Sequence, residues 1–372
     1  TWLSRSPEEP ELEKATRGPA DGFVETMLFN VNAVRRRIRD RNFRAQNVKV
    51  GKRSKNDVSL VYMDDIVDKD LLNDIKNKLE SVDVDGLPLA DKSVEEIITG
   101  GSINPFPLVR YTERPDNVAA HILEGHLAII VDNSPTAIIL PAPFFFFFLT
   151  LEIYRKGQVV GSYLSSMRMV AIIISVFLPV IWFLAATNKE LLPEYLQFIG
   201  VKKESTIDLG IQFILASVGI DLIRMASVQT PTTLATSLSL IGALILGDFA
   251  VKIGLFSPEV VLYMAVAGIG NFAIPGYELA LVLKLVRLLL LLAAIIGNII
   301  GFVITLAGVT IWMLFTKTFG VYYLWPLIPF NYSALKSYIL NQSLLDLSHI
   351  RPQVLNVQDK DRSVKEDDKE ND

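Results

Sequence analysis

Charged side chains inside apolar runs are the residues of this sequence best placed to do chemistry. Asp248 and Lys252 lie four positions apart in a largely apolar stretch, so on a helix they would share one face and could form an ion pair. A charge at the centre of a lipid bilayer costs about 2.5–3.5 kcal/mol, so such residues usually face protein or water. The pair therefore has two interpretations: a structural ion pair that fixes helix packing, or one wall of an aqueous path.

Further polar residues repeat this pattern in the C-terminal half. Asp221 and Arg224 lie three positions apart and could pair in the same way, or face the interior of a helix bundle. The amides of Asn271 and Asn298 could hydrogen-bond between helices, each contributing about 0.6 kcal/mol. The candidate pore-lining or intramembrane polar residues are Asp248, Lys252, Asn271, Asp221, Arg224, Glu278 and Asn298.

The sequence contains no pattern of a known catalytic site. It has no Gly-x-Ser-x-Gly elbow, no phosphate-binding P-loop and no His-Glu-x-x-His motif. It has no cysteine, which excludes thiolate ligands and cysteine nucleophiles, and its three histidines lack metal-ligand spacing. The Asp-Val-Asp-Gly motif at residues 83–86 lacks the remainder of a calcium-binding loop. We therefore expect no enzymatic activity, no cofactor and no metal.

The composition indicates that part of the chain lies in a membrane. Hydrophobic residues make up 51% of the 372 residues and charged residues 20%, and the mean hydropathy is +0.37. Soluble domains rarely combine such hydropathy with so few charges. The expected fold class is an α/β soluble N-terminal domain followed by an α-helical transmembrane bundle of four to six spans.

Residues 1–143 carry the patterns of the soluble domain. Alternating runs on both sides of a Ser-Lys-Asn-Asp turn at residues 54–57 predict a hairpin, and a second hairpin is expected over residues 126–141. Asp68 is expected to cap the helix that follows it. Because strand patterns alternate with helical ones, the sequence predicts an α/β domain.

Residues 17–55 form a basic segment, with eleven Lys or Arg against three acids. One interpretation is a solvated helix. A second is a surface that binds anionic lipid headgroups, to which each basic residue would contribute about 1 kcal/mol. Nucleic acid is not an expected partner, because aromatic residues are almost absent from the segment.

Five consecutive phenylalanines follow Pro141 and Pro143, with a further proline at Pro135. These prolines would damage a spanning helix, and residues 144–151 supply only about half of the ~20 residues that a span needs. The rings would either enter the lipid interface or form a buried patch against the first span. We expect residues 144–168 to be an interfacial connector.

Uncharged runs after this connector predict the spans. Residues 169–188 are bracketed by cations, as a crossing helix should be. Further crossings are expected over residues 234–255 and 260–283. The uncharged run 288–316 would measure roughly 44 Å as one helix, against a hydrocarbon core of about 30 Å. It must tilt strongly or bend near residues 297–301.

The whole transmembrane helical domain is expected to cover residues 169–330. Glu278, Lys284 and Arg287 flank an Ile-Pro-Gly break inside it, where they would contact lipid headgroups. Residues 331–372 would form a cytosolic tail. From about residue 359 this tail is charged and lacks apolar anchors, which predicts disorder.

Many motifs of this sequence resemble one known family. They are RGPADGF at 17–23, VRRRIR at 34–39, VDVDG at 82–86, YTERPD at 111–116, IGALILGDFAVKIGLFSPEVV at 241–261, IGNFAIPGYELAL at 269–281 and PLIPF at 326–330. In this order they are similar to the A subunits of bacterial spore germination receptors, the GerA family, over about residues 15–355. The stretches LEIYRKGQVVGSYL at 151–164 and GIDLIRMASVQTP at 219–231 are most similar to the stage V sporulation protein AF branch of that family.

The resemblance implies an integral, multi-pass protein of the inner membrane of bacterial endospores, with its N-terminal domain in the cytosol. It implies a homo-oligomeric ring, proposed to be pentameric, whose membrane helices conduct ions during germination beside partner germination membrane proteins. Family members carry additional residues before the motif at 17–23, so the sequence is expected to be N-terminally truncated.

Two alternatives to an ion-conducting subunit remain. The chain could be a non-conducting membrane scaffold that stabilises partner germination proteins. A secondary transporter would require an inverted internal repeat, and the breaks near residues 275–276 and 297–301 are close neighbours rather than symmetry mates. The transporter therefore ranks last.

Overall fold

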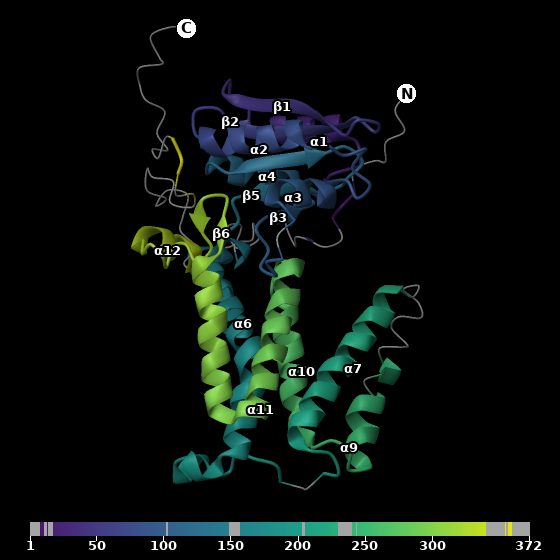
Figure 1. Cartoon of the computed structure of the whole chain (residues 1–372), viewed down its shortest axis with the longest axis vertical. Helices are drawn as coiled ribbons and strands as arrows, with labels where there is room; N and C mark the ends of the chain where they lie inside the picture. The colour runs from purple at the N-terminus through teal and green to yellow at the C-terminus, as the bar shows by residue number, and fades with distance from the viewer. Residues whose placement is uncertain are drawn as a thin grey trace. The chain divides into compact units, whose positions relative to one another are not determined.

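The chain forms two compact units. Thr1–Ser166 together with Met313–Asp372 make the first, here called the head unit, and Met167–Trp312 make the second, the helical unit (Figure 1). The structure, a computed structural model, describes residues 8–10, 13, 18–101, 103–148, 157–202, 205–229, 240–242, 244–339, 354 and 356–358.

The head unit is built on a five-stranded antiparallel sheet with the strand order β1-β2-β4-β5-β3. The hairpin predicted around residues 54–57 is confirmed, with Val48 of β1 opposite Val58 of β2. The second predicted hairpin is β4–β5, in which Ile129 lies opposite Ile138. The strands are β1 (Phe43–Val50), β2 (Asn56–Met63), β3 (Arg110–Thr112), β4 (Leu127–Val131) and β5 (Ala137–Leu140).

Helices cover both faces of this sheet, which confirms the α/β class of the domain. One layer, α1 and α4, packs on β2 and β4, and the other, α2 and α3, packs on β1, β4 and β5. Side chains alternate between the faces, so Leu60 points into the core shared with α2 and α3, whereas Val61 is buried on the opposite face. The helices are α1 (Met27–Arg35), α2 (Lys69–Ser81), α3 (Asp91–Thr99) and α4 (Pro115–Leu123).

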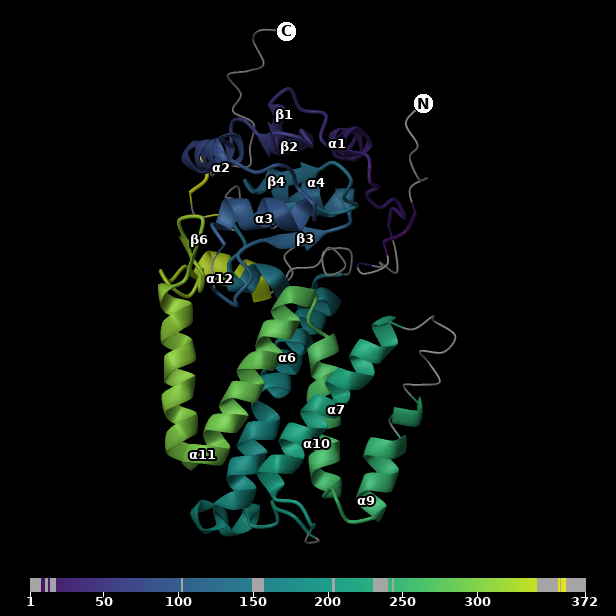
Figure 2. The same ribbon diagram turned by 45° about the vertical axis from the view of Figure 1, so that its right-hand side comes forward.

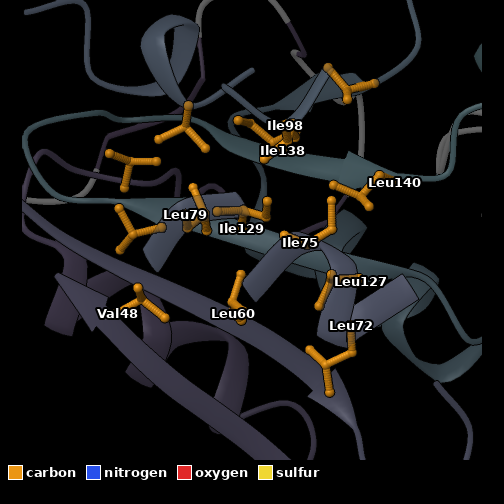
Figure 3. Close-up of a cluster of buried hydrophobic side chains, with 14 of the residues drawn as sticks. Val48, Leu60, Leu72, Ile75, Leu79, Ile98, Leu127, Ile129, Ile138 and Leu140 are labelled. Atoms are coloured by element: carbon orange, nitrogen blue, oxygen red, sulfur yellow. The ribbon is translucent and has the colours of Figure 1, made fainter. Parts of the chain in front are cut away.

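The core beneath α2 consists of aliphatic side chains at helical spacing. Leu72, Ile75 and Leu79 of α2 lie against Ile129 and Ile138 of the sheet (Figure 3). Complete burial of each such side chain stabilises the fold by about 1.5–3 kcal/mol. The predicted N-cap is also present, since the carboxylate of Asp68 accepts hydrogen bonds from two backbone N–H groups of the first turn.

The five phenylalanines form a short 3₁₀ helix, η1 (Phe144–Phe148), in the head unit. The four rings from 145 to 148 are buried, and the rings of His121 and His126 pack on Phe146 with centroids 4.6 and 4.4 Å away. Of the two interpretations of these rings, burial is the one observed, and the covering rings include His121, His126 and Tyr338 of the head unit. Residues 149–156 of the predicted connector lie outside the described residues.

A small hairpin and a last helix complete the head unit. They are β6 (Lys317–Thr318), β7 (Val321–Tyr322) and α12 (Tyr332–Ile339). The buried hydroxyl of Thr318 donates to the carbonyl of Leu108 at 2.7 Å and accepts from the N–H of Ala142 at 3.3 Å. Residues 313–330, which the sequence placed with the transmembrane helices, thus belong to the head unit.

The helical unit contains α6 (Gln158–Thr187), which includes the predicted first span and begins eleven residues before it. α7, α10 and α6 meet around Trp182, whose ring lies 5.8 Å from that of Phe213 and 4.9 Å from that of Tyr263. The remaining elements are η2 (Lys189–Leu191), η3 (Glu194–Leu196), α7 (Leu209–Gln229), η4 (Leu244–Phe249, a π-helix), α9 (Ala250–Lys252), α10 (Pro258–Phe272) and α11 (Tyr277–Phe315).

The long apolar run bends where the sequence predicted. α11 has 39 residues, and Asn298 within it has a non-helical backbone, with φ 50° and ψ −140°. The two arms fold back on each other as a hairpin (Figure 2). A Cβ at Gly301 would lie 2.2 Å from the carbonyl oxygen of Ala293, so the bend requires glycine there.

The single crossing expected over residues 260–283 is wrong, because the chain divides it between α10 and α11. α10 ends at Phe272 and α11 begins at Tyr277, with Pro275 between them. A proline cannot donate an intrahelical hydrogen bond and clashes with the preceding turn. Part of the crossing expected over residues 234–255 lies outside the described residues.

Three helices of the described residues are long and apolar enough to cross a membrane: α6, residues 209–226 of α7, and α11. α10 is equally apolar in character but has only 15 residues. α11 alone would measure about 58 Å if straight, so its bend brings each arm closer to the thickness of a bilayer. The count of four to six spans stays a prediction.

His126 is completely buried in the head unit, beside the backbone carbonyls of Leu140 and Pro141. Burial lowers the pKa of His126 from about 6.5 to about 3, and the charge of Arg110 acts in the same direction. The imidazole is therefore neutral in the folded head, while in the unfolded chain it would be protonated below about pH 6.5.

The stability of the head unit should fall as the pH drops from about 6.5 toward 3, because the unfolded state then binds the extra proton. The loss from this group is up to about 1.4 kcal/mol per pH unit. Hydrogen exchange of the β4 and β5 amides, converted to opening free energies at each pH, measures it in the whole chain. His126→Phe should flatten the slope, and an unchanged slope would contradict the assignment.

A candidate polar site among the apolar helices

Arg287 of α11 is the most buried charge among the described residues of the helical unit, with 5% of the residue exposed. Its guanidinium donates a hydrogen bond to the backbone carbonyl of Ser175 on α6 at 3.0 Å. Pro179 lies four residues after Ser175 in the same helix, and it has no N–H with which to bond that carbonyl. Arg287 thus supplies the donor that the proline removes, which satisfies a group that apolar surroundings would otherwise leave unpaired.

Lys284, one turn before Arg287, forms an ion pair with Asp221 of α7 at 2.5 Å. The side chains are 20% and 36% exposed, and Asp221 also lies within electrostatic range of Arg287. We call Ser175, Asp221, Lys284 and Arg287 the polar network. It joins α6, α7 and α11, and it contains two cations and one carboxylate, so it carries one net positive charge.

Arg224 does not pair with Asp221 as their spacing had suggested. Its guanidinium instead lies over the ring of Tyr277 at 5.0 Å and that of Phe272 at 5.7 Å. These two rings flank the break between α10 and α11. The pairing fails because Asp221 finds a closer cation on another helix, while Arg224 stacks on aromatic faces that attract it.

Asn271 takes no part in the hydrogen bonds that join the described residues of the polar network, although its neighbour Gly270 lies against Ser175. The residue is buried, and its side-chain oxygen has no hydrogen-bond partner among the described residues. Its neighbour Gly270 marks a close helix contact, because a Cβ there would lie 2.6 Å from the carbonyl oxygen of Ala171 on α6. α6 and α10 therefore pack backbone to backbone beside Asn271.

The other sequence candidates occupy separate places. Asp248 and Lys252 form the predicted ion pair at 2.5 Å, with side chains 54% and 66% exposed. Asn298 exchanges two hydrogen bonds of 2.7 Å with Asn188, next to the bend of α11. Glu278 is half-buried in the first turn of α11. The structure thus brings one of the seven candidates, Asp221, into the polar network.

Sequence reasoning assigned Lys284 and Arg287 to lipid headgroups, and for Arg287 this is wrong because the residue is buried. A signal was present in the sequence. A proline inside the first predicted span frees one backbone carbonyl, and a buried arginine is the side chain most able to satisfy it. The partner helix could not be named, because nothing in the sequence places residue 287 beside residue 175.

The chemistry of the polar network is electrostatic. The described residues contain no group of three His, Asp or Glu able to hold a metal ion. The network holds fixed charges and hydrogen bonds between apolar helices, and its Lys284–Asp221 end is only partly covered. Such a group either locks helix packing or presents a charge to an aqueous path.

Comparisons with known proteins agree with one another. The family model described as "Bacillus/Clostridium GerA spore germination protein" matches residues 1–354. Stage V sporulation protein AF of Bacillus subtilis (strain 168) is 46% identical over 356 residues, covering 95% of this chain and 72% of that protein. Spore germination protein KA of the same organism is 30% identical over 335 residues, covering 89% and 61%.

Among solved structures, the chain is similar to the crystal structure of the N-terminal domain of the A subunit of the Bacillus megaterium spore germinant receptor GerK3. It is 36% identical in sequence, and the match covers 33% of this chain and 97% of that one with a TM-score of 0.28.

A double-mutant cycle tests the link between Arg287 and Pro179. Pro179→Ala restores an N–H for the carbonyl of Ser175, so Arg287→Met should cost less in that background than in the wild type. We expect a coupling free energy of about 0.5–2 kcal/mol from thermal unfolding in detergent. Arg224→Met is the matched control, because Arg224 stacks on rings and should combine additively with Pro179→Ala. Additivity for Arg287 as well would contradict the link.

Proposed function

Because the chain belongs to the GerA family of spore germination proteins, we propose that it is a membrane subunit of a spore germination complex that conducts ions. In this proposal the apolar helices cross the inner membrane of the endospore several times, and the head unit lies in the cytosol. Copies of the chain form a ring, proposed to be pentameric, which releases ions during germination. Other germination membrane proteins are its partners. The binding of anionic lipid headgroups by residues 17–55 stays a prediction.

The observation that carries the ion-conducting function is the polar network. Three charged side chains from two apolar helices gather at one place, and each would be costly in a lipid environment. Arg287 has a structural role, because it donates a hydrogen bond to the carbonyl of Ser175. The Asp221–Lys284 pair has no such structural necessity and stays partly exposed, so in a membrane it requires water or protein beside it.

The pair's position supports a path along α7 and α11. Small residues let these helices approach closely: a Cβ at Gly210 of α7 would lie 2.8 Å from the side chain of Ile295 on α11. A fixed positive charge beside a narrow path changes which ions enter it, because the Coulomb term is large where water is scarce. The net charge of the network would therefore act on the selectivity of the path.

A non-conducting scaffold is the second candidate. It is favoured by the pairing within the network, since a paired cluster also fixes helix packing without a pore. The many exposed apolar side chains of the helical unit would serve a scaffold and a channel equally, as lipid or partner contacts. The two candidates differ in whether removing a network charge changes ion flux.

Ion flux through liposomes containing the full-length protein, alone and with its partner membrane proteins, tests the proposal. Lys284→Gln removes the net positive charge and should raise the permeability of cations relative to anions by about tenfold, equivalent to roughly 1.4 kcal/mol. Asp221→Asn should act in the opposite direction. Lys252→Gln alone is the control, because it removes one positive charge from an ion pair outside the network.

Three outcomes separate the candidates. A selectivity change in the network variants alone supports a path beside Lys284. Unchanged flux with loss of the assembled complex supports the scaffold. No flux from the wild type, even with its partners present, would overturn ion conduction.

A further inference from the structure

The last described residues of the chain return to the head unit and pack on it. They are residues 354 and 356–358, here called the tail segment, which is the short yellow trace beside α2 in Figures 1 and 2. Val354 and Val357 are 5% and 7% exposed, whereas Asn356 and Gln358 are exposed. Because the apolar side chains turn inward and the polar ones outward, the segment is bound to the head unit along one side.

The socket that receives Val357 is formed by two turns at one end of the sheet. Ile66 lies in the turn after β2, and Gly125 lies in the turn before β4. These strands are antiparallel neighbours, so the end of β2 and the start of β4 meet at the same end of the sheet. The N–H of Gln358 donates a hydrogen bond of 2.9 Å to the carbonyl of Ile66. One apolar side chain and one backbone hydrogen bond thus fix the tail segment at the same place.

The backbone of Gly125 is the part of this socket that requires glycine. Its φ is 100°, a conformation that residues with a Cβ rarely adopt. A Cβ there would lie 2.2 Å from Cγ1 of Val357 and 3.2 Å from Cγ2 of Ile66. Any larger residue would therefore strain the turn and also displace the valine side chain from the socket.

The turn that carries Gly125 also covers the phenylalanine helix η1. His126 directly follows this glycine, and its buried ring packs on that of Phe146 with centroids 4.4 Å apart. A second part of the C-terminal region contacts η1 directly, since the ring of Tyr338 in α12 lies 6.4 Å from that of Phe145. The C-terminal region thus supports η1 in two places, and η1 is the last described element before α6.

The contacts of the tail segment are few, and a cavity borders it. Two valine side chains and one backbone hydrogen bond must offset the conformational entropy lost on ordering the segment, and these opposing contributions are similar in size. Asn356 lines a cavity of about 470 Å³ together with residues of α2, α3 and the β6–β7 hairpin. The segment can therefore leave without opening the aliphatic core, and its docked and undocked forms lie close in free energy.

We propose that the tail segment is a reversible latch on the head unit. While Val357 occupies the socket of Ile66 and Gly125, it holds the turn before β4 against Phe146 and keeps η1 buried. When the segment leaves, η1 loosens at the point where the head unit leads into α6. The socket is thus a peptide-binding surface whose occupant is the C-terminal region of this chain. The latch goes beyond the proposed function, and its failure would leave ion conduction standing.

Two truncations of the otherwise complete protein test the latch. A chain that ends at residue 353 lacks the tail segment, whereas a chain that ends at residue 360 keeps it and is the matched control. In η1 the N–H groups of Phe144 and Phe146 donate to carbonyls at 2.8 and 2.9 Å. Hydrogen exchange of residues 144–148 should be about tenfold faster in the shorter chain, with exchange of β1 and β2 unchanged. Equal exchange of residues 144–148 in the two chains would overturn the proposal.

A peptide added to the shorter chain shows whether the socket recognises the segment itself. A segment tethered near its own site experiences an effective concentration on the order of 1 mM, so a synthetic peptide of residues 353–359 at about that concentration should restore slow exchange of residues 144–148. The same peptide with Val357→Asp is the control and should restore nothing, because its carboxylate would lose water in the socket. Protection by neither peptide, or equally by both, would overturn the socket as a recognition surface.

A spin label measures docking directly, because the sequence contains no cysteine and Gln358→Cys supplies a single attachment site that keeps its N–H. The label should be immobilised in the full-length protein. Gly125→Ala should lower the ratio of immobilised to mobile label by about tenfold, because the new Cβ meets Val357. Gly100→Ala is the matched control, since that glycine also has a positive φ, of 74°, but has open space at its Cβ position. A label that is mobile in the unsubstituted chain, or released equally by both substitutions, would overturn the latch.

Discussion

In apolar surroundings a backbone carbonyl of a helix must find its hydrogen-bond donor within the protein. The helical unit depends on the donor that the carbonyl of Ser175 finds. Pro179 removes the N–H that would have bonded the carbonyl of Ser175. The guanidinium of Arg287 takes its place from another helix. The hydrogen bond missing within α6 is thereby replaced by one between α6 and α11, and this bond also satisfies one donor of the buried guanidinium.

The ion pair of the polar network lies next to this link. Once Arg287 is held against α6, Lys284 one turn away can meet Asp221 of α7, and the three helices share one cluster of charges. Glycines set how closely the neighbouring helices approach, as Gly270 does against the backbone of α6. The head unit is instead stabilised by the burial of aliphatic side chains between an antiparallel sheet and the helices on its faces.

Sequence patterns predicted the parts whose physics is local. Both hairpins, the cap at Asp68 and the bend within residues 297–301 depend on residue types close together in the chain, and all are present. The patterns failed where partners are distant. The five phenylalanines could not be assigned between lipid and core without knowing that His121 and His126 cover Phe146. Asp221 was recognised as a candidate, but its partner on α11 lies 63 positions away.

The central claim is that Asp221 and Lys284 face each other between α7 and α11 in the working protein. Exchanging the two charges tests it most directly, by thermal unfolding in detergent and ion flux in liposomes. Asp221→Lys and Lys284→Asp should each lower stability, and the combined exchange should recover most of the loss. A combined variant no more stable than the poorer single one, with flux equally impaired, would contradict the claim.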